Sequence, residues 1–350
     1  MSNQHDKAMR AGVFLGVGQM EVREMAVPTP GKGEVLLKVL ACGVCGTDYH
    51  IYSGHLTAGV EPPVVLGHEI AAEVVETGEG VDRLETGQFC AVDPVIGCGQ
   101  CRMCREARPN LCAAPSIIGY KLNGGFAQYL KAPASKVVPL NASVGPSGGV
   151  LCETLACVLN GYSRLQPPAG ADVLVLGAGT VGLLWLQVLR SSPVRRIIAT
   201  EPVAFRREKA ERLGADTAID PSSDGFAELL AEKLPEGADV MVDATGDPSA
   251  VEQAIPLLAP GGTFMIFGVC PAGSSVSFDP AQLYEKQARI VASKMPPATL
   301  DKAGRLIEAG RIACDELVTE TRGLDSLAGS VAGFNDHRGS QVKVAINPWR

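Results

Sequence analysis

The second half of the chain shows a regular alternation of apolar runs with segments that mix apolar and polar residues. The short runs predict strands, and the mixed segments predict amphipathic helices. Strands that alternate with helices are typical of a doubly wound parallel sheet. The predicted strands are 172–176, 196–200, 217–219, 240–243, 262–268 and 290–292, and the predicted helices between them are 180–189, 205–213, 226–234 and 250–258.

The first part of the chain has a different pattern, in which short apolar runs are separated by glycine and proline. The clearest predicted strands are 34–40 and 70–75, and their imperfect alternation indicates burial on both faces in places. A polar lobe at 98–112 interrupts the strands, and strand character resumes at 124–131. We therefore expect an all-β body with loops.

Two further helices and a final strand complete the predicted layout. A helix at 151–164 leads into the alternating region, and another is expected at 299–309. The strand 342–346 then resembles the first part of the chain, so we expect the C-terminal tail to return there and complete its sheet.

Composition and charge place the protein in a broad class. The chain has 350 residues, 46% of them hydrophobic, and a net charge of -7. The negative charge argues against partners such as nucleic acid or an acidic membrane surface. The N-terminus lacks the apolar core of a signal peptide, so we expect a cytoplasmic protein without a membrane partner.

The segment Gly177-Ala-Gly-Thr-Val-Gly182 follows a predicted strand and opens a predicted helix. This is the context in which G-x-G-x-x-G binds a dinucleotide, with the pyrophosphate at the helix N-terminus. The cofactor-binding residues predicted here are Gly177, Gly179, Val181 and Gly182.

An acidic residue, Glu201, ends the second predicted strand, about 20 residues after the motif. Its carboxylate would accept hydrogen bonds from the adenosine ribose and repel a 2′-phosphate, so NAD is favoured over NADP. Arg206 and Arg207 qualify this preference, because an arginine there would meet a phosphate or stack on adenine.

Four cysteines, Cys98, Cys101, Cys104 and Cys112, form a ladder in the polar lobe. Four thiolates close a tetrahedral zinc site without an open position, which makes the site structural. An iron–sulfur cluster is the rival, but the last spacing is longer than in ferredoxin runs. Disulfides are disfavoured because the chain has no secretory signal.

A second group of metal-binding residue types lies nearer the N-terminus. Cys45 and His68 are natural ligands for a catalytic zinc, which keeps one open position. Glu69 is either a ligand or a supporting group, and Asp48 is placed to accept the other N–H of His68. A further ligand is needed, and neighbouring Cys152 and Glu153 are both candidates.

In these residues and in their order, the sequence resembles the zinc-containing medium-chain dehydrogenase/reductase family of alcohol and polyol dehydrogenases. The shared features are C-G-x-C-G-T-D-x-H, G-H-E, the cysteine ladder, E-x-L-A-C and G-x-G-x-x-G. The resemblance covers essentially the whole chain. It implies an α/β protein with a GroES-like β-barrel catalytic domain, formed by 1–153 and 299–350, around a Rossmann domain with a doubly wound parallel sheet, 154–298.

The resemblance also implies roles for single residues. Cys45, His68 and Glu153 would surround the catalytic zinc, with Glu69 a ligand or a carboxylate that exchanges with water. Thr47 would hydrogen-bond the substrate oxygen, and His50 would pass its proton toward solvent. The ladder would hold a second zinc, so two ions are expected per chain. A homo-oligomer, dimer or tetramer, is also implied.

Two positions bear on the substrate. Gly46 is often arginine in simple alcohol dehydrogenases of animals, and Thr154 is usually proline in the polyol branch. We expect hydride transfer from a secondary alcohol of a polyol or sugar to NAD. Threonine oxidation is the nearest alternative and a simple alcohol the next. A zinc-containing redox sensor or partner-binding protein is the alternative of a different class.

Overall fold

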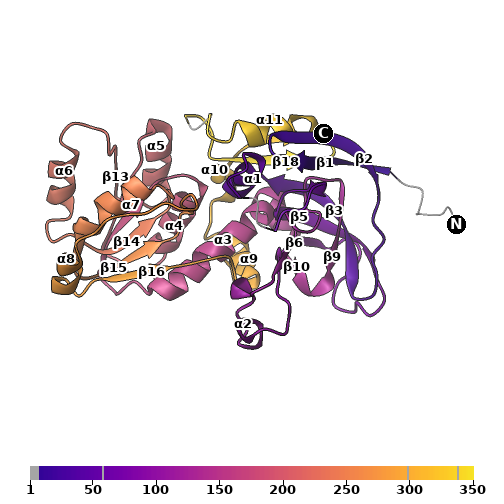
Figure 1. Cartoon of the computed structure of the whole chain (residues 1–350), viewed down its shortest axis with the longest axis horizontal. Helices are drawn as coiled ribbons and strands as arrows, with labels where there is room; N and C mark the ends of the chain where they lie inside the picture. Colours follow the sequence, from indigo (N-terminus) through magenta and orange to yellow (C-terminus); the bar gives the residue numbers. More distant parts are fainter. Residues whose placement is uncertain (1–7, 57–58, 298, 337–338) are drawn as a thin grey trace.

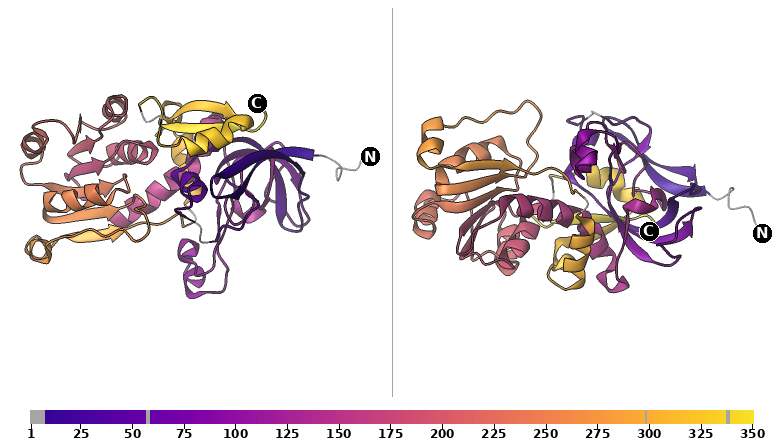
Figure 2. Two further views of the ribbon diagram at one scale, coloured as in Figure 1. Left: turned by 45° about the horizontal axis from the view of Figure 1, so that its top comes forward. Right: turned by 90° about the horizontal axis from the view of Figure 1, so that it is seen from below.

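The computed structural model describes residues 8–56, 59–297, 299–336 and 339–350 and shows an elongated molecule with two lobes (Figure 1). The first described residues and the C-terminal segment lie together in one lobe, and the middle of the sequence forms the other. Figure 2 shows the same division from two further directions. The predicted return of the C-terminal segment to the first part of the chain is therefore confirmed.

The first lobe is a β body in which the last strand of the chain pairs with an early one. Its main sheet has the order β10-β6-β5-β3-β18-β17, and β9 also pairs with β3. Smaller sheets, β2-β1-β4 and β7-β8, flank it. The strands are β1 (Ala8–Gly16), β2 (Gln19–Ala26), β3 (Glu34–Gly43), β4 (Val64–Val65), β5 (Glu69–Thr77), β6 (Phe89–Val92), β7 (Val95–Ile96), β8 (Ser116–Ile117), β9 (Tyr129–Pro133), β10 (Val137–Pro139), β17 (Val318–Gly323) and β18 (Lys343–Asn347).

The second lobe is the predicted doubly wound sheet. Its strands are parallel and have the order β13-β12-β11-β14-β15-β16, the 3-2-1-4-5-6 arrangement of dinucleotide-binding folds. The strands are β11 (Asp172–Leu176), β12 (Arg196–Thr200), β13 (Thr217–Ile219), β14 (Ala238–Asp243), β15 (Leu258–Ile266) and β16 (Arg289–Ala292). The helices of this lobe are α4 (Thr180–Arg190), α5 (Ala204–Arg212), α6 (Phe226–Lys233), α7 (Pro248–Ala254) and α8 (Pro280–Glu285).

The helix α3 (Gly145–Leu165) joins the two lobes. It packs against β3, β5 and β6 on one side and against α4, β15 and β16 on the other. The buried residues of α3, such as Val150, belong to an apolar cluster that also contains Trp185 of α4 and Leu300 of α9. The segment 142–165 is long and apolar enough to cross a membrane by length and composition, but 56% of its apolar window is buried inside the protein. This burial is what a core helix shows.

The structure also departs from the sequence prediction. The first lobe is not all-β with loops, because α1 (Gly46–Tyr52) follows β3 directly. The predicted strand at 124–131 begins only at Tyr129. The remaining helices of the first lobe are α2 (Arg102–Arg105), α9 (Leu300–Glu308), α10 (Cys314–Leu317) and α11 (Leu327–Ala332). The predicted domain boundaries at 153/154 and 298/299 stay predictions, and the first falls within α3.

Candidate metal and cofactor site

Cys45 lies between the end of β3 and the first turn of α1. The backbone N–H of Cys45 donates to the Asp48 Oδ2 at 2.9 Å, so a carboxylate of the first turn caps the helix. The cap fixes the Cys45 side chain at the start of the helix. A cysteine sulfur held at this place is a ready metal ligand.

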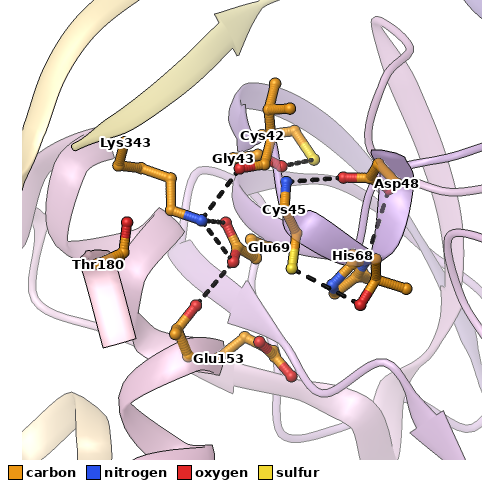
Figure 3. A network of polar contacts seen from close by, with 12 residues as sticks. Cys42, Gly43, Cys45, Asp48, His68, Glu69, Glu153, Thr180 and Lys343 are labelled. Carbon is orange, nitrogen blue, oxygen red and sulfur yellow. Dashed lines mark hydrogen bonds and ion pairs between the residues drawn. The ribbon is translucent and has the colours of Figure 1, made fainter. Parts of the chain in front are cut away.

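His68 and Glu69 approach Cys45 from the start of β5 (Figure 3). A ring nitrogen of His68, a carboxylate oxygen of Glu69 and the Cys45 Sγ all lie within 4.8 Å of one another. The His68 Nδ1 is 3.7 Å from the Asp48 Oδ1, close to the predicted contact but longer than a hydrogen bond. Both atoms are buried without a hydrogen-bond partner among the described residues.

The charges of this group act strongly on His68. Burial disfavours the imidazolium, but the Cys45 thiolate and the carboxylates of Asp48 and Glu153 raise the pKa of His68 well above its ordinary value. A metal ion bound among these groups would offset the repulsion between the negative charges that surround the buried imidazole. The donor set, one sulfur, one nitrogen and carboxylate oxygens, is that of catalytic zinc sites, so the predicted ion fits these residues.

Glu153 reaches the same region from α3, as Figure 3 shows. Burial, opposed by His68, raises the pKa of Glu153 to about 7, and the Cys157 thiol donates to its Oε1 at 3.4 Å. Glu153 is not within the 4.8 Å group of the other three residues. Cys152 points elsewhere, because its thiol donates to the Leu300 carbonyl at 3.6 Å. The geometry therefore favours Glu153 over Cys152.

Two residues that the sequence analysis did not select hold Glu69. Lys343 pairs with Glu69 at 2.6 Å, and the Thr154 hydroxyl donates to the Glu69 Oε1 at 2.8 Å. Burial alone would raise the pKa of Glu69. The charge of Lys343 outweighs that effect with the help of other contacts, so the pKa lies below its ordinary value. A signal for Lys343 was available, since a single lysine in the apolar strand Val-Lys-Val-Ala-Ile seldom becomes buried without a carboxylate partner.

The four cysteines of the ladder lie close together in the segment 98–112, which contains α2 and projects from the first lobe (Figure 1). This segment is called the cysteine lobe below. The four sulfur atoms all lie within 4.8 Å of one another, and the Sγ atoms of Cys101 and Cys112 are 3.9 Å apart. A tetrahedral site with zinc–sulfur bonds of about 2.3 Å requires a sulfur separation of about 3.8 Å. Backbone N–H groups of Cys98 and Ala114 donate to the Cys112 Sγ and help to fix its position. The cluster fits a closed structural zinc site.

The glycine-rich turn after β11 has the geometry that the motif requires. Gly177 has a φ of +89°, and a Cβ on Gly182 would lie 1.9 Å from the Gly177 carbonyl oxygen. Both positions therefore require glycine for backbone reasons. A Cβ built on Gly179 would have one neighbouring atom within 4 Å, a guanidinium nitrogen of Arg206 at 3.9 Å. This leaves room for a pyrophosphate at the N-terminus of α4, beside Val181.

Glu201 follows β12 beside this turn, as predicted. Its Oε2 accepts from the Ala178 N–H at 2.8 Å, and its Oε1 accepts from the Val203 N–H at 3.1 Å. Arg206 donates to the Gln341 carbonyl at 2.9 Å. The Arg206 side chain therefore links the cofactor lobe to the C-terminal segment.

The residues predicted to move the proton lie on α1. The Thr47 hydroxyl is 3.7 Å from the Cys45 Sγ. The rings of His50 and His55 have centroids 5.9 Å apart, and burial together with His55 lowers the pKa of His50. His55 is exposed, and its ring lies beside that of His50. His5 and His337 lie outside the described residues.

Comparison with known proteins agrees with this geometry. The family model "Alcohol dehydrogenase GroES-like domain" matches residues 31–142, and "Zinc-binding dehydrogenase" matches residues 180–309. The L-threonine 3-dehydrogenase of Pyrococcus abyssi is 35% identical over 85% of this chain and 87% of its own length. The D-arabinitol dehydrogenase 1 of Uromyces fabae is 31% identical over 92% of both chains.

A solved structure shows the same architecture. A protein from Sinorhizobium meliloti 1021, described as a zinc-binding dehydrogenase and bound to NADP, superimposes with a TM-score of 0.93. It is 33% identical and covers 98% of this chain and 100% of its own. The chain therefore belongs to the zinc-containing medium-chain dehydrogenase family and is an NAD(P)-dependent oxidoreductase of alcohols.

Proposed function

We propose that the protein oxidises a secondary alcohol of a polyol or sugar alcohol with NAD as the hydride acceptor. The observation that carries this proposal is the charge around the metal-binding group. Asp48, Glu69 and Glu153 contribute carboxylates, and the buried cation beside them, Lys343, is occupied by Glu69. A neutral polyhydroxylated substrate avoids repulsion from these carboxylates, whereas a substrate carboxylate would be repelled.

The chain's own residues have distinct roles in this reaction. Cys45, His68 and a carboxylate hold the ion, and Asp48 steadies His68. When bound, zinc supplies Lewis acidity that lowers the pKa of a substrate hydroxyl. Thr47 would accept the hydroxyl proton while it passes its own proton on to His50, which would release a proton toward solvent. The glycine turn and Glu201 position the nicotinamide cofactor.

The preference for NAD depends on Glu201. Glu201 is buried at the end of β12, and its carboxylate would repel the 2′-phosphate of NADP. Arg206 opposes this preference in part, although its guanidinium already donates to the Gln341 carbonyl. The similar Sinorhizobium structure is bound to NADP, so the proposed preference for NAD is supported by the Glu201 carboxylate of this chain and not by that relative.

We expect polyols to be better substrates than L-threonine by at least about tenfold in kcat/KM, which corresponds to about 1.4 kcal/mol. The measurement is NADH formation over a panel of pentitols, hexitols, a diol, a simple secondary alcohol and L-threonine, repeated with NADP. Threonine is the second candidate because of the 35% identical relative. A higher kcat/KM for threonine than for each polyol would replace the first proposal with the second.

We expect His50→Gln to lower kcat at neutral pH by about 10²-fold, since a positioned acid–base group contributes about that much. Because the pKa of His50 is lowered, its neutral form persists into mildly acidic solution, so the wild-type rate rises with pH in that range and then levels off. The deficit of the variant should shrink at alkaline pH, where hydroxide takes the proton.

The matched control for His50 is His55→Gln. Removing this neighbour raises the pKa of His50, so the acid limb of the pH profile should move to higher pH while the plateau is kept. An unchanged rate and profile in His50→Gln would exclude the proposed proton path.

A further inference from the structure

Lys343 is a buried cation at the start of β18, with 4% of its surface exposed. Its Nζ donates to the Glu69 Oε1 at 2.7 Å, to the Glu69 Oε2 at 2.6 Å and to the Val44 carbonyl at 3.1 Å. An ammonium has three hydrogens, so these contacts use its whole donor capacity. Figure 3 shows the lysine on the side of Glu69 away from His68.

Glu69 is held on both of its oxygens. Besides Lys343, the Thr154 hydroxyl donates to the Oε1 at 2.8 Å, and the carboxylate is 1% exposed. Charge-assisted hydrogen bonds of this length are among the stronger ones in proteins. A Glu69 oxygen lies within 4.8 Å of the Cys45 and His68 ligand atoms, so the carboxylate is within reach of an ion that these residues would hold. Turning the carboxylate fully onto that ion would weaken its contacts with Lys343 and leave a buried ammonium short of a partner, which is strongly unfavourable.

The buried Asp48 carboxylate contributes one negative charge wherever Glu69 lies. The remaining charges balance when Glu69 stays with Lys343. A divalent cation is neutralised by one thiolate, Cys45, and one carboxylate, Glu153, with His68 as a neutral ligand. Glu69 and Lys343 then form a second neutral pair. With Glu69 on the ion as well, the ion would carry an excess negative charge while Lys343 carried an uncompensated positive one.

We propose that Lys343 is a positioning residue that keeps Glu69 out of the metal's coordination shell, so that Glu153 supplies the carboxylate ligand and one position stays free for the substrate. This inference deepens the proposed function and rests on it for the role of the free position. The placement of Glu69 itself is independent of which alcohol is oxidised.

The backbone of Lys343 is fixed by both lobes. The preceding carbonyls of Gln341 and Val342 accept hydrogen bonds from Arg206 and from the Thr180 hydroxyl of the cofactor lobe. On the other side, β18 pairs with β3 of the first lobe. The ammonium is therefore delivered to Glu69 by a strand that is anchored at two places, which suits a positioning role.

The first test is the crystal structure of the zinc-loaded wild-type protein. We expect a Glu153 oxygen at about 2.0–2.2 Å from the ion, the usual zinc–carboxylate distance, and Glu69 still paired with Lys343. A direct bond between Glu69 and the ion in the wild-type protein would overturn the proposal. This measurement requires no activity and no variant.

The second test compares Lys343→Met with Lys343→Arg and with the double variant Lys343→Met/Glu69→Gln. We expect Lys343→Met to bring Glu69 onto the ion and to lower kcat/KM by about 10–100-fold, the usual effect of losing a residue that orients a metal ligand. Lys343→Arg keeps the charge and should retain the wild-type coordination. The double variant removes the freed carboxylate and should regain at least about tenfold of the loss.

Two results would overturn the proposal in this series: unchanged coordination in Lys343→Met, or a double variant no more active than Lys343→Met. Failure of the proposed function looks different. In that case no alcohol of the panel is oxidised, while the coordination seen in the crystals still responds to Lys343→Met.

Discussion

Replacing Cys45 by alanine is expected to lower zinc from about two ions per chain to about one and to lower kcat by about 10³-fold or more. Cys45 is the one sulfur of the group that also contains His68 and Glu69. A Lewis acid contributes several kcal/mol of charge stabilisation, and about 4 kcal/mol corresponds to a 10³-fold change in rate. Zinc analysis by mass spectrometry and steady-state kinetics on the best polyol measure both effects.

The matched control is Cys42→Ala, three residues earlier in the chain. Cys42 is a fully buried thiol in the apolar core of the first lobe, and burial raises its pKa well above the ordinary value. This variant should keep both zinc ions and lose only about 1 kcal/mol of stability through the small cavity that it leaves. Normal turnover by Cys45→Ala with one zinc ion would exclude the proposed centre.

Cys104→Ser is expected to unfold the cysteine lobe, because a structural zinc site contributes directly to folding free energy. Apparent zinc-binding energies of about 10–16 kcal/mol in small zinc domains indicate how much is lost when the site opens. Few other contacts order the lobe, since α2 has no buried residue and the main anchor is the buried Asn110, which donates to the Lys294 carbonyl at 2.8 Å. Trypsin should then cut after Arg102 or Arg105 much faster than in the wild-type protein.

Cys270→Ser is the control for the cysteine lobe, because Cys270 is a half-buried free cysteine outside both metal groups. It should leave the zinc content and the tryptic pattern unchanged. If Cys104→Ser keeps two zinc ions and resists trypsin like the wild-type protein, then the four cysteines do not form a structural site.

The cofactor lobe followed closely from the sequence, because each buried parallel strand is a continuous apolar run between turns. The predicted strands 172–176, 196–200 and 217–219 coincide with β11, β12 and β13. The helices that follow these strands are amphipathic or end near a glycine. Their predicted first and last residues therefore lie within one residue of those of α4, α5 and α6. Local patterns suffice here because the chain neighbours of each element are also its neighbours in space.

The metal group was less fully predictable. Its short-range members, Cys45, Asp48, His68 and Glu69, fall in two compact segments and were selected from residue type and spacing. α1 was missed because its seven residues, Gly46–Tyr52, are too short to show a helical period. Lys343 lies 274 residues from Glu69, and no local pattern indicates that two such distant residues meet.

The pairing of β18 with β3 has a consequence for the order in which the two metal centres form during folding. Lys343 lies 274 residues from Glu69, and contacts between residues so far apart in sequence form slowly because a long loop must close first. The four cysteines of the ladder lie close together in the sequence and require only short loops. We therefore expect the structural zinc site to form early in folding and the Glu69–Lys343 pair beside the catalytic centre to form late.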